Sequence, residues 1–316
     1  MLEACITWAL AVLENLGYQM QNQEPEIILK TAWSSVFRFS TQLGFCYLKQ
    51  VPPALSLEMN VIQILQTHSS SVPILIASNP KEHCFLMQDA GIPLREFFKQ
   101  QFNVNILKIA IQDYIYLQHA MIDHLPLFLN IGVPDWRLNK IPSLYQELIT
   151  QEKLLLEDGL TAAELKQLFL TQQKLIDLCQ QISHYPIPET LSHCDFHDNN
   201  LLIQPKKQKI TVVDLGEVAI THPFFSLLNV LHRTKETYQL TESQYGSLQQ
   251  HALKPWLKFA SQEQLLQVMS LIKQCWSIHH VLAEYRLIQS IDQVFSEKLR
   301  REGRLANNLR FWLKST

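Results

Sequence analysis

One polar motif constrains this chain more than any other feature. Residues 193–200 read His-Cys-Asp-Phe-His-Asp-Asn-Asn, and residues 213–216 read Val-Asp-Leu-Gly. The residues from 201 to 213 form two apolar runs around a polar turn, which predicts a β-hairpin. That hairpin brings Asn200 and Asp214 to the same end of its ladder, although they lie fourteen positions apart. The motif thereby predicts a polar centre built on a hairpin.

The spacing within the motif indicates a reaction class. Asp195 is followed by Asn200 five positions later and by Asp214 beyond the hairpin. Taken singly, an Asp or Asn before a strand is usually a turn residue. Taken together, they match a catalytic base and two magnesium ligands arranged around a nucleoside triphosphate. We therefore expect phosphoryl transfer, with Asp195 as the base and Asn200 and Asp214 as Mg²⁺ ligands.

His193 and His197 flank the expected base and allow two interpretations. With neighbouring carboxylates they could bind zinc, as in a metallohydrolase. Such a site needs further ligands, and the later histidines fall mainly in expected helices without a partner motif. The favoured interpretation is that both rings brace the loop by hydrogen bonds.

The N-terminal part carries residues suited to hold a nucleotide. Lys49 lies on an expected strand and Glu58 on the next helix, the arrangement in which a Glu orients a Lys that contacts the α- and β-phosphates. The turn where a glycine-rich phosphate loop would fall, residues 32–36, has no glycine. Ser34 and Ser35 could offer backbone N–H and hydroxyl groups to phosphate instead.

Hydrophobic patterning predicts an α+β fold of two lobes. A small β-rich N-terminal lobe, residues 1–90, is expected to bind nucleotide, and a large, mainly helical lobe, residues 91–316, to carry the catalytic loop and substrate site. Gln88 and Ala90 fall in the expected hinge, where backbone groups would read adenine. The pattern predicts strands at 27–31, 33–40, 44–50, 73–78 and 83–88, and helices at 2–16, 55–68, 94–100, 104–122, 141–155, 161–183 and throughout 223–316.

Composition excludes several partners. The net charge is −2 with no run of like charges, so neither a nucleic-acid footprint nor a membrane-binding patch is expected. The six cysteines are scattered without a paired motif, which is typical of reduced thiols in a cytoplasmic protein. No stretch approaches the roughly 20 apolar residues of a membrane span.

The motif resembles that of the aminoglycoside phosphotransferase and choline kinase family, whose fold is similar to that of protein kinases. His193, Asp195, His197, Asn200 and Asp214 occupy the matching positions. The resemblance implies transfer of the γ-phosphate of ATP to a hydroxyl of a small molecule, such as an aminoglycoside, choline, an amino alcohol or a sugar. It also implies Mg²⁺ as cofactor and contact between Lys49 and the ATP phosphates.

The chain departs from the family pattern at three points. Cys194 replaces the usual glycine, the phosphate loop lacks glycine, and Ser226 replaces an aspartate that braces the catalytic loop. A non-catalytic nucleotide-binding protein on the same fold is therefore the main alternative. A protein kinase is less well supported, because no Arg precedes Asp195 and no Ala-Pro-Glu follows Gly216.

Two places are candidates for contact with the acceptor. Asp198 and Glu217 lie near the motif and could bind the acceptor or a second metal. Trp276, His280 and Glu284 recur every four residues and so share one helix face. An aromatic ring with an acid suits a cationic or sugar-like acceptor, although packing against neighbouring helices would explain the same face.

Overall fold

The computed structural model describes residues 2–22, 24–291 and 303–315. Its internal contacts divide the chain into two compact units. The first consists principally of residues 1–97 and 199–216, and the second principally of residues 98–198 and 217–289 with the C-terminal helix. The predicted α+β class is confirmed, with a small β-rich N-terminal part and a larger helical part. The predicted boundary at residue 90 differs from this division, because the motif hairpin belongs to the first unit.

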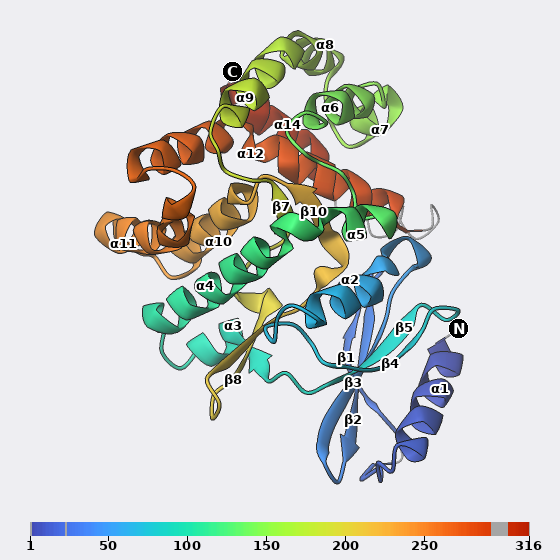
Figure 1. The fold of residues 1–316 in the computed structure, drawn as a ribbon. Helices are drawn as coiled ribbons and strands as arrows, with labels where there is room; N and C mark the ends of the chain where they lie inside the picture. Colours follow the sequence, from blue (N-terminus) through green and yellow to red (C-terminus); the bar gives the residue numbers. More distant parts are fainter. Residues whose placement is uncertain (1, 23, 292–302, 316) are drawn as a thin grey trace. The chain divides into compact units, whose positions relative to one another are not determined.

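The first unit contains a five-stranded antiparallel sheet in the order β1-β2-β3-β5-β4. Helix α1 lies alongside this sheet (Figure 1), and its buried residues share one apolar cluster with alternate residues of the strands, including Phe37, Phe39 and Leu48. The elements are α1 (Leu2–Asn15), β1 (Glu26–Lys30), β2 (Ser35–Thr41), β3 (Gly44–Gln50), α2 (Leu57–Gln66), β4 (Leu75–Asn79) and β5 (Cys84–Gln88). Each lies where the hydrophobic pattern predicted it.

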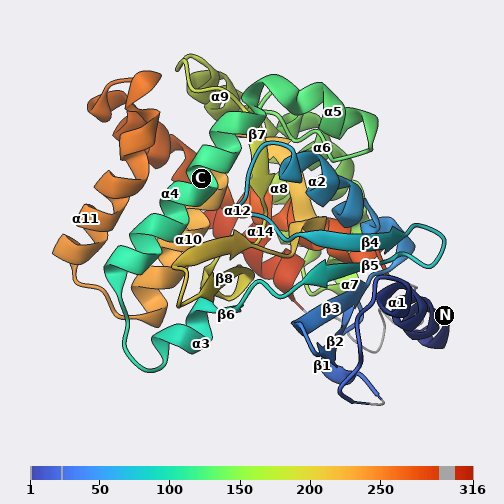
Figure 2. The same ribbon diagram turned by 60° about the horizontal axis from the view of Figure 1, so that its bottom comes forward.

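A second, three-stranded sheet of this unit has the order β6-β8-β9 and carries the motif hairpin (Figure 2). Its strands are β6 (Ile92–Pro93), β8 (Leu201–Gln204) and β9 (Lys209–Val212). Gly91 has φ +102°, and a Cβ added there would lie 2.0 Å from the carbonyl oxygen of Ile203. Because only glycine permits this approach, Gly91 is what lets β6 pair with the hairpin.

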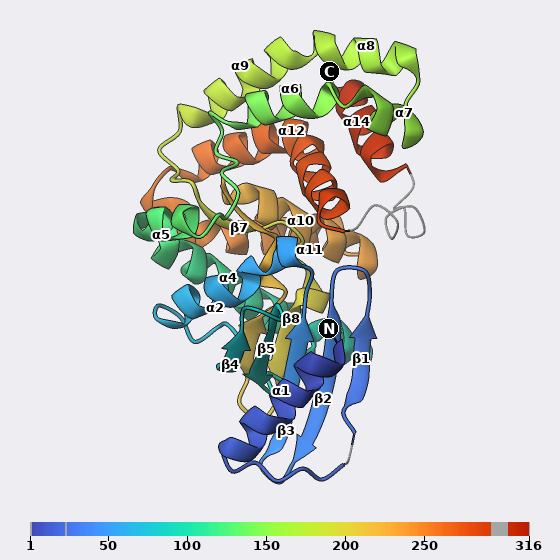
Figure 3. The same cartoon turned by 90° about the vertical axis from the view of Figure 1, so that its right-hand side faces the viewer.

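The second unit is mainly helical. Helix α12 contacts α14, α9 and α6, and α8 contacts α14 and α6, so these helices form one layered group (Figure 3). Helix α3 (Leu94–Phe98) lies almost wholly in the first unit and ends at the boundary. The helices of the second unit are α4 (Val104–Met121), α5 (Leu125–Asn130), α6 (Ile141–Ile149), α7 (Glu152–Glu157), α8 (Ala162–Leu170), α9 (Gln172–Ser183), α10 (Phe224–Thr237), α11 (Glu242–Leu253), α12 (Gln262–Gln289) and α14 (Arg304–Ser315).

The sequence pattern missed three features of this unit, the first of which is the short helix α5. Strands β7 (Thr190–His193) and β10 (Val218–Thr221) pair antiparallel, so the motif hairpin is not the only β-structure after the N-terminal part. Both strands have four residues and are buried throughout, and so they show no alternation. The predicted helices at 141–155 and 161–183 are each divided in two, at residues 150–151 and at Thr171.

Among the described residues, every helix is too short or too polar to cross a membrane.

Replacing Gly91 by Ala tests the close approach of β6 and the hairpin. We expect a loss of about 2–4 kcal/mol in the free energy of unfolding, because the methyl group collides with backbone that cannot move aside. Urea titration measures this loss. Gly44→Ala is the matched control: Gly44 also has positive φ, at +111°, but nothing lies within 4 Å of its added Cβ. Equal losses in the two variants would contradict the role of the contact.

Candidate active site

A buried ammonium group organises the polar centre of the first unit. Lys49 on β3 lies 2.9 Å from Glu58 Oε1 and 2.6 Å from Asp214 Oδ1, measured from its Nζ. Glu58 on α2 also accepts a hydrogen bond from the backbone N–H of Leu215, at 3.1 Å. The structure thus brings together Lys49, Glu58 and Asp214. The sequence predicted the pairing of Lys49 with Glu58, whereas the contact of Lys49 with Asp214 was not predicted.

These contacts decide the charge of the lysine. Burial by itself lowers the pKa of Lys49, but the carboxylates of Asp214 and Glu58 outweigh it and raise that pKa above its usual value. Burial raises the pKa of Glu58, and the Lys49 ammonium opposes that effect. Lys49 is therefore charged at neutral pH and suited to hold anionic oxygens.

The open end of the hairpin carries the two candidate metal ligands. The N–H of Val213 donates to the carbonyl oxygen of Asn200 at 3.0 Å, which makes Asn200 and Asp214 neighbours across the ladder. Asp214 has φ +61°, a conformation that costs energy for a residue with a side chain. One amide and one carboxylate oxygen fit Mg²⁺, which prefers hard oxygen ligands and takes the rest from phosphates and water.

The turn that replaces a glycine-rich loop is closed by a threonine. The Thr31 hydroxyl accepts hydrogen bonds from the backbone N–H of Trp33 at 3.2 Å and of Ser34 at 3.0 Å. Amides of this turn are those that a phosphate would use, and here Thr31 occupies them. Ser35 begins β2 and is buried. The predicted phosphate contacts of Ser34 and Ser35 therefore require the turn to rearrange.

The two predicted hinge residues lie at the end of β5. Gln88 is the last residue of that strand, is exposed, and donates its N–H to Ile74 at 2.9 Å. Ala90 lies in the segment before β6 and is partly buried. Their predicted contact with adenine stays a prediction.

In the second unit, Asp195 is held by the two motif histidines. His197 Nε2 donates to Asp195 Oδ2 at 3.1 Å, and the backbone N–H of Asp195 donates to His193 Nδ1 at 3.2 Å. Both rings are buried. The rings brace the loop as the sequence analysis expected. Among the described residues no three His, Cys, Asp or Glu side chains are grouped to hold a metal ion.

A neutral network supports this loop at the position where the sequence resemblance predicted an aspartate. The Tyr114 hydroxyl donates to Ser226 Oγ at 2.9 Å and accepts from the N–H of His193 at 2.8 Å. Ser192 and Ser226 share a short hydrogen bond, and Asn229 Nδ2 donates to the carbonyl of Phe196 at 3.2 Å. Because the hydroxyls of Tyr114, Ser192 and Ser226 are hydrogen-bonded to one another in the core, a serine can replace the charged brace.

Arg233 on α10 also contacts the candidate base. Its Nη2 donates to Asp195 Oδ1 at 3.1 Å. Burial would raise the pKa of Asp195, but the hydrogen bond from His197 and the charge of Arg233 hold that pKa well below its usual range. Asp195 is thus a carboxylate at neutral pH, suited to orient a hydroxyl and to receive its proton late in the reaction.

A cavity of about 590 Å³ opens beside Asp195 in the same unit. Trp276, His280 and Glu284 all line it, so their shared helix face borders the candidate base. Its other charged residues are Glu217, Glu236, Arg233 and Arg304. Even without Glu284, the three acidic residues Asp195, Glu217 and Glu236 outnumber the two arginines, so the cavity favours a ligand that carries positive charge.

The two residues proposed near the acceptor have different surroundings. Glu217 lines the cavity. Asp198 is buried, accepts a short hydrogen bond from the Tyr238 hydroxyl and lies 3.8 Å from His197 Nδ1. Its position suits a brace of the loop better than a contact with the acceptor, and it is not among the described residues that line the cavity.

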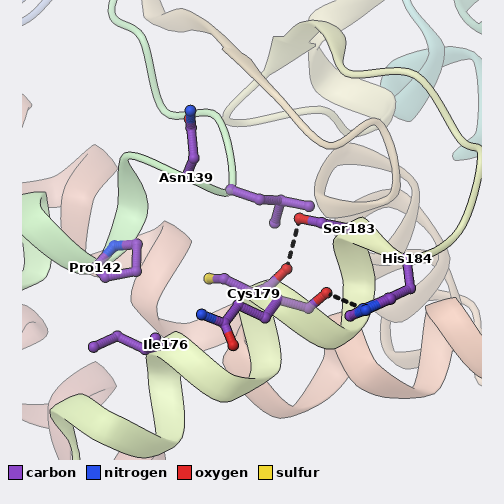
Figure 4. Close-up of a pocket in the computed structure, with 8 residues that line it drawn as sticks. Asn139, Pro142, Ile176, Cys179, Ser183 and His184 are labelled. Atoms are coloured by element: carbon purple, nitrogen blue, oxygen red, sulfur yellow. Dashed lines mark hydrogen bonds between the residues drawn. The ribbon is translucent and has the colours of Figure 1, made fainter.

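A second hollow in this unit lies between α6 and α9 (Figure 4). Cys179, Ser183 and His184 are among its lining residues, and the side chains of Ser183 and His184 are hydrogen-bonded to the carbonyl oxygens of Cys179 and Gln180, one helical turn back. Burial raises the pKa of Cys179 to about 12, so its thiol is unreactive at neutral pH. The hollow thus offers little chemistry beside that of the Asp195 cavity.

The sequence analysis missed Arg233 and the brace formed by Tyr114. Asn229, Arg233 and Glu236 recur at helical spacing and all line the cavity. This helical periodicity was the sequence signal that could have placed Arg233 on the same face as the cavity-lining residues. The contact of Tyr114 with His193 spans 79 positions and leaves no local signature.

Comparison with known proteins supports this architecture. The model of the phosphotransferase enzyme family matches residues 29–260. An ethanolamine kinase from Plasmodium vivax has a TM-score of 0.63 at 13% identity, covering 96% of this chain and 86% of its own. An aminoglycoside phosphotransferase from Streptomyces rimosus, solved with ADP and streptomycin, has a TM-score of 0.52 at 17% identity, covering 84% of this chain and 97% of its own. An amicoumacin kinase, solved with AMP-PNP, has a TM-score of 0.55 at 15% identity, covering 97% of this chain and 93% of its own.

No curated protein matches the sequence. At these identities the likeness to solved structures establishes the fold alone, and that fold is the protein-kinase-like fold of phosphotransferases. The family match spans most of the chain. The chain therefore belongs to the phosphotransferase enzyme family.

Replacing Glu284 by Gln tests the electrostatics of the cavity. Burial raises the pKa of Glu284 to about 7 against a usual 4.5, with Arg304 opposing. Because the folded protein retains a proton that the unfolded chain releases, wild-type stability falls as pH rises from about 4.5 to 7. The Gln side chain stays neutral at every pH. We therefore expect the free energy of unfolding of the variant to exceed that of wild type by about 1–3 kcal/mol at pH 8 and by little at pH 5. Urea titrations at both pH values measure this, and a pH-independent difference would contradict it.

Proposed function

We propose that this protein transfers the γ-phosphate of ATP to a hydroxyl group of a small molecule. The observation that carries the proposal is the pairing of Lys49 with Glu58 and Asp214, at the end of a hairpin whose other flank is Asn200. A buried, charged lysine next to two oxygen ligands suits triphosphate and Mg²⁺. The run from Asp195 to Asn200 tethers the candidate base to these groups within five positions.

Each residue has a distinct role in this proposal. Lys49 binds the α- and β-phosphates, and Asn200 and Asp214 would hold Mg²⁺, which when bound neutralises charge on the phosphates. Asp195 accepts a hydrogen bond from the acceptor hydroxyl and orients its oxygen toward the γ-phosphorus. The new O–P bond forms as the bond to the bridging oxygen breaks; ADP leaves with the electron pair, and the hydroxyl proton passes to Asp195.

The cavity beside Asp195 narrows the class of acceptor. It combines the carboxylates of Glu217 and Glu236 with the ring of Trp276. Such a wall binds a hydroxyl compound that carries an amine or ammonium group. The neighbours act on or bind compounds named ethanolamine and streptomycin, which is consistent with that class.

A screen of ATP consumption tests the function directly. The acceptors are aminoglycosides, choline, ethanolamine, other amino alcohols and neutral sugars, each with ATP and Mg²⁺. Transfer to amine-bearing alcohols with little transfer to neutral sugars is the expected result. Absence of transfer to every acceptor, despite nucleotide binding, would favour the alternative below.

The alternative is a non-catalytic nucleotide-binding protein, and one observation favours it. The turn at residues 31–34 contains no glycine and has amides occupied by Thr31. Thermal shift with ATP and Mg²⁺, followed by measurement of slow hydrolysis without acceptor, distinguishes the two functions. Binding without any turnover is the signature of the alternative.

Asp195→Asn tests the base. We expect the rate of transfer to fall on the order of 10²–10⁴-fold, because the amide keeps the shape but cannot accept the proton. Nucleotide affinity, measured by thermal shift, should change little. Transfer at the wild-type rate would show that Asp195 is not the base.

Asp214→Ala tests the metal site. Removing this carboxylate should abolish the Mg²⁺-dependent part of nucleotide binding, because one of the two proposed protein ligands is lost. Thermal shift with ATP, with and without Mg²⁺, measures the effect. The exposed Asp123 provides the control variant Asp123→Ala, which should respond like wild type. A persistent Mg²⁺-dependent shift in Asp214→Ala would remove Asp214 from the site.

A further inference from the structure

Both carboxylate oxygens of the candidate base are hydrogen-bonded to side chains of the same chain. Asp195 Oδ2 accepts from His197 and Oδ1 accepts from Arg233, each at 3.1 Å. An acceptor hydroxyl must reach one of these oxygens before it can attack. One of the two contacts therefore has to open or be shared during the reaction.

The two contacts differ in how easily they open. The His197 side chain is only 8% exposed and belongs to the braced loop, whereas the Arg233 side chain is 44% exposed and lies on the cavity wall. A half-exposed ion pair contributes little to stability, so its opening is inexpensive. Arg233 also has Glu236 one helical turn away in the same cavity, as a second carboxylate to approach.

The cavity also contains polar groups suited to an acceptor. Asn229, Ser277 and Trp276 line it, and Asn229 Oδ1, Ser277 Oγ and Trp276 Nε1 are buried atoms with no hydrogen-bond partner among the described residues. Asn229 and Ser277 are almost completely buried, with only 2% and 3% of their surface exposed. Because unsatisfied buried polar groups are costly, an acceptor that satisfies them gains binding energy. A water molecule at Asp195 gains none of these contacts.

We propose that Arg233 is a latch on Asp195, which acceptor binding displaces, so that the triphosphate is protected from water while the cavity is empty. This inference rests on the proposed function. Arg233 acts through Asp195 and is thus a positioning residue. The binding energy of the acceptor opens the latch, which couples occupancy of the cavity to activation of the base.

The side reaction that the latch suppresses is hydrolysis of the nucleoside triphosphate. The oxygen of a water molecule bonds to the γ-phosphorus, and the bond to the bridging oxygen breaks. The nucleoside diphosphate leaves with the electron pair, and the proton of the water passes to Asp195 and then to solvent. This reaction needs the same carboxylate oxygen as transfer, so a guanidinium on that oxygen hinders it until an acceptor arrives.

The test is release of inorganic phosphate from ATP and Mg²⁺ without acceptor. Arg233→Gln and Arg233→Met should increase this rate about 3- to 10-fold, the factor expected when a half-exposed charged contact is removed. Arg233→Lys should lie between these variants and wild type, because it keeps the charge but not the planar fork. Damage to the fold lowers the rate and so cannot produce the increase.

Arg137→Gln is the matched control. Arg137 is a partly exposed arginine paired with Asp135 at 2.7 Å, and both lie in the second unit outside the cavity wall. Its removal should leave acceptor-free hydrolysis unchanged. Nucleotide affinity of the Arg233 variants, from thermal shift, should equal that of wild type, which excludes tighter substrate binding as the cause of a rise.

Two outcomes would overturn the latch, and they are distinguishable. Measurable hydrolysis by wild type that is unchanged or lower in Arg233→Gln and Arg233→Met overturns the latch and leaves the proposed function intact. No turnover of triphosphate by wild type or any variant, with or without the acceptors screened above, overturns both.

Discussion

The ammonium of Lys49 is the group on which the polar centre of the first unit depends. A buried charge is costly unless it is paired, and here two carboxylates from separate segments approach it. Glu58 connects it to α2, and Asp214 connects it to the end of the motif hairpin. Removing Lys49 would leave two neighbouring carboxylates without a counter-charge, so this one ammonium holds the three segments together.

That arrangement also accounts for the strained backbone at Asp214. Its left-handed conformation places the carboxylate against Lys49 while Val213 pairs with Asn200. Strain of this kind persists only where the surroundings determine it. The ion cluster around Lys49 and the ladder hydrogen bond of Val213 together hold Asp214 in this conformation. They thereby place both candidate magnesium ligands.

The catalytic loop is supported by a different kind of interaction. Tyr114, Ser192 and Ser226 form a neutral hydrogen-bonded network at the position where the sequence resemblance predicted an aspartate. A neutral network avoids the desolvation cost of a buried carboxylate. The loss of that aspartate therefore does not by itself indicate a disabled enzyme, because His193 and His197 still hold Asp195.

The sequence by itself determined the order of the reactive groups and the elements that carry them. The motif spacing and the hairpin pattern predicted the meeting of Asn200 with Asp214, and strand and helix periodicity predicted Lys49 opposite Glu58. The tertiary structure alone decided that Arg233 lies on Asp195, that Thr31 closes the phosphate turn and that Glu284 is buried. The physical reason is that spacing encodes local geometry, whereas burial and pairing between distant segments depend on how the whole chain packs.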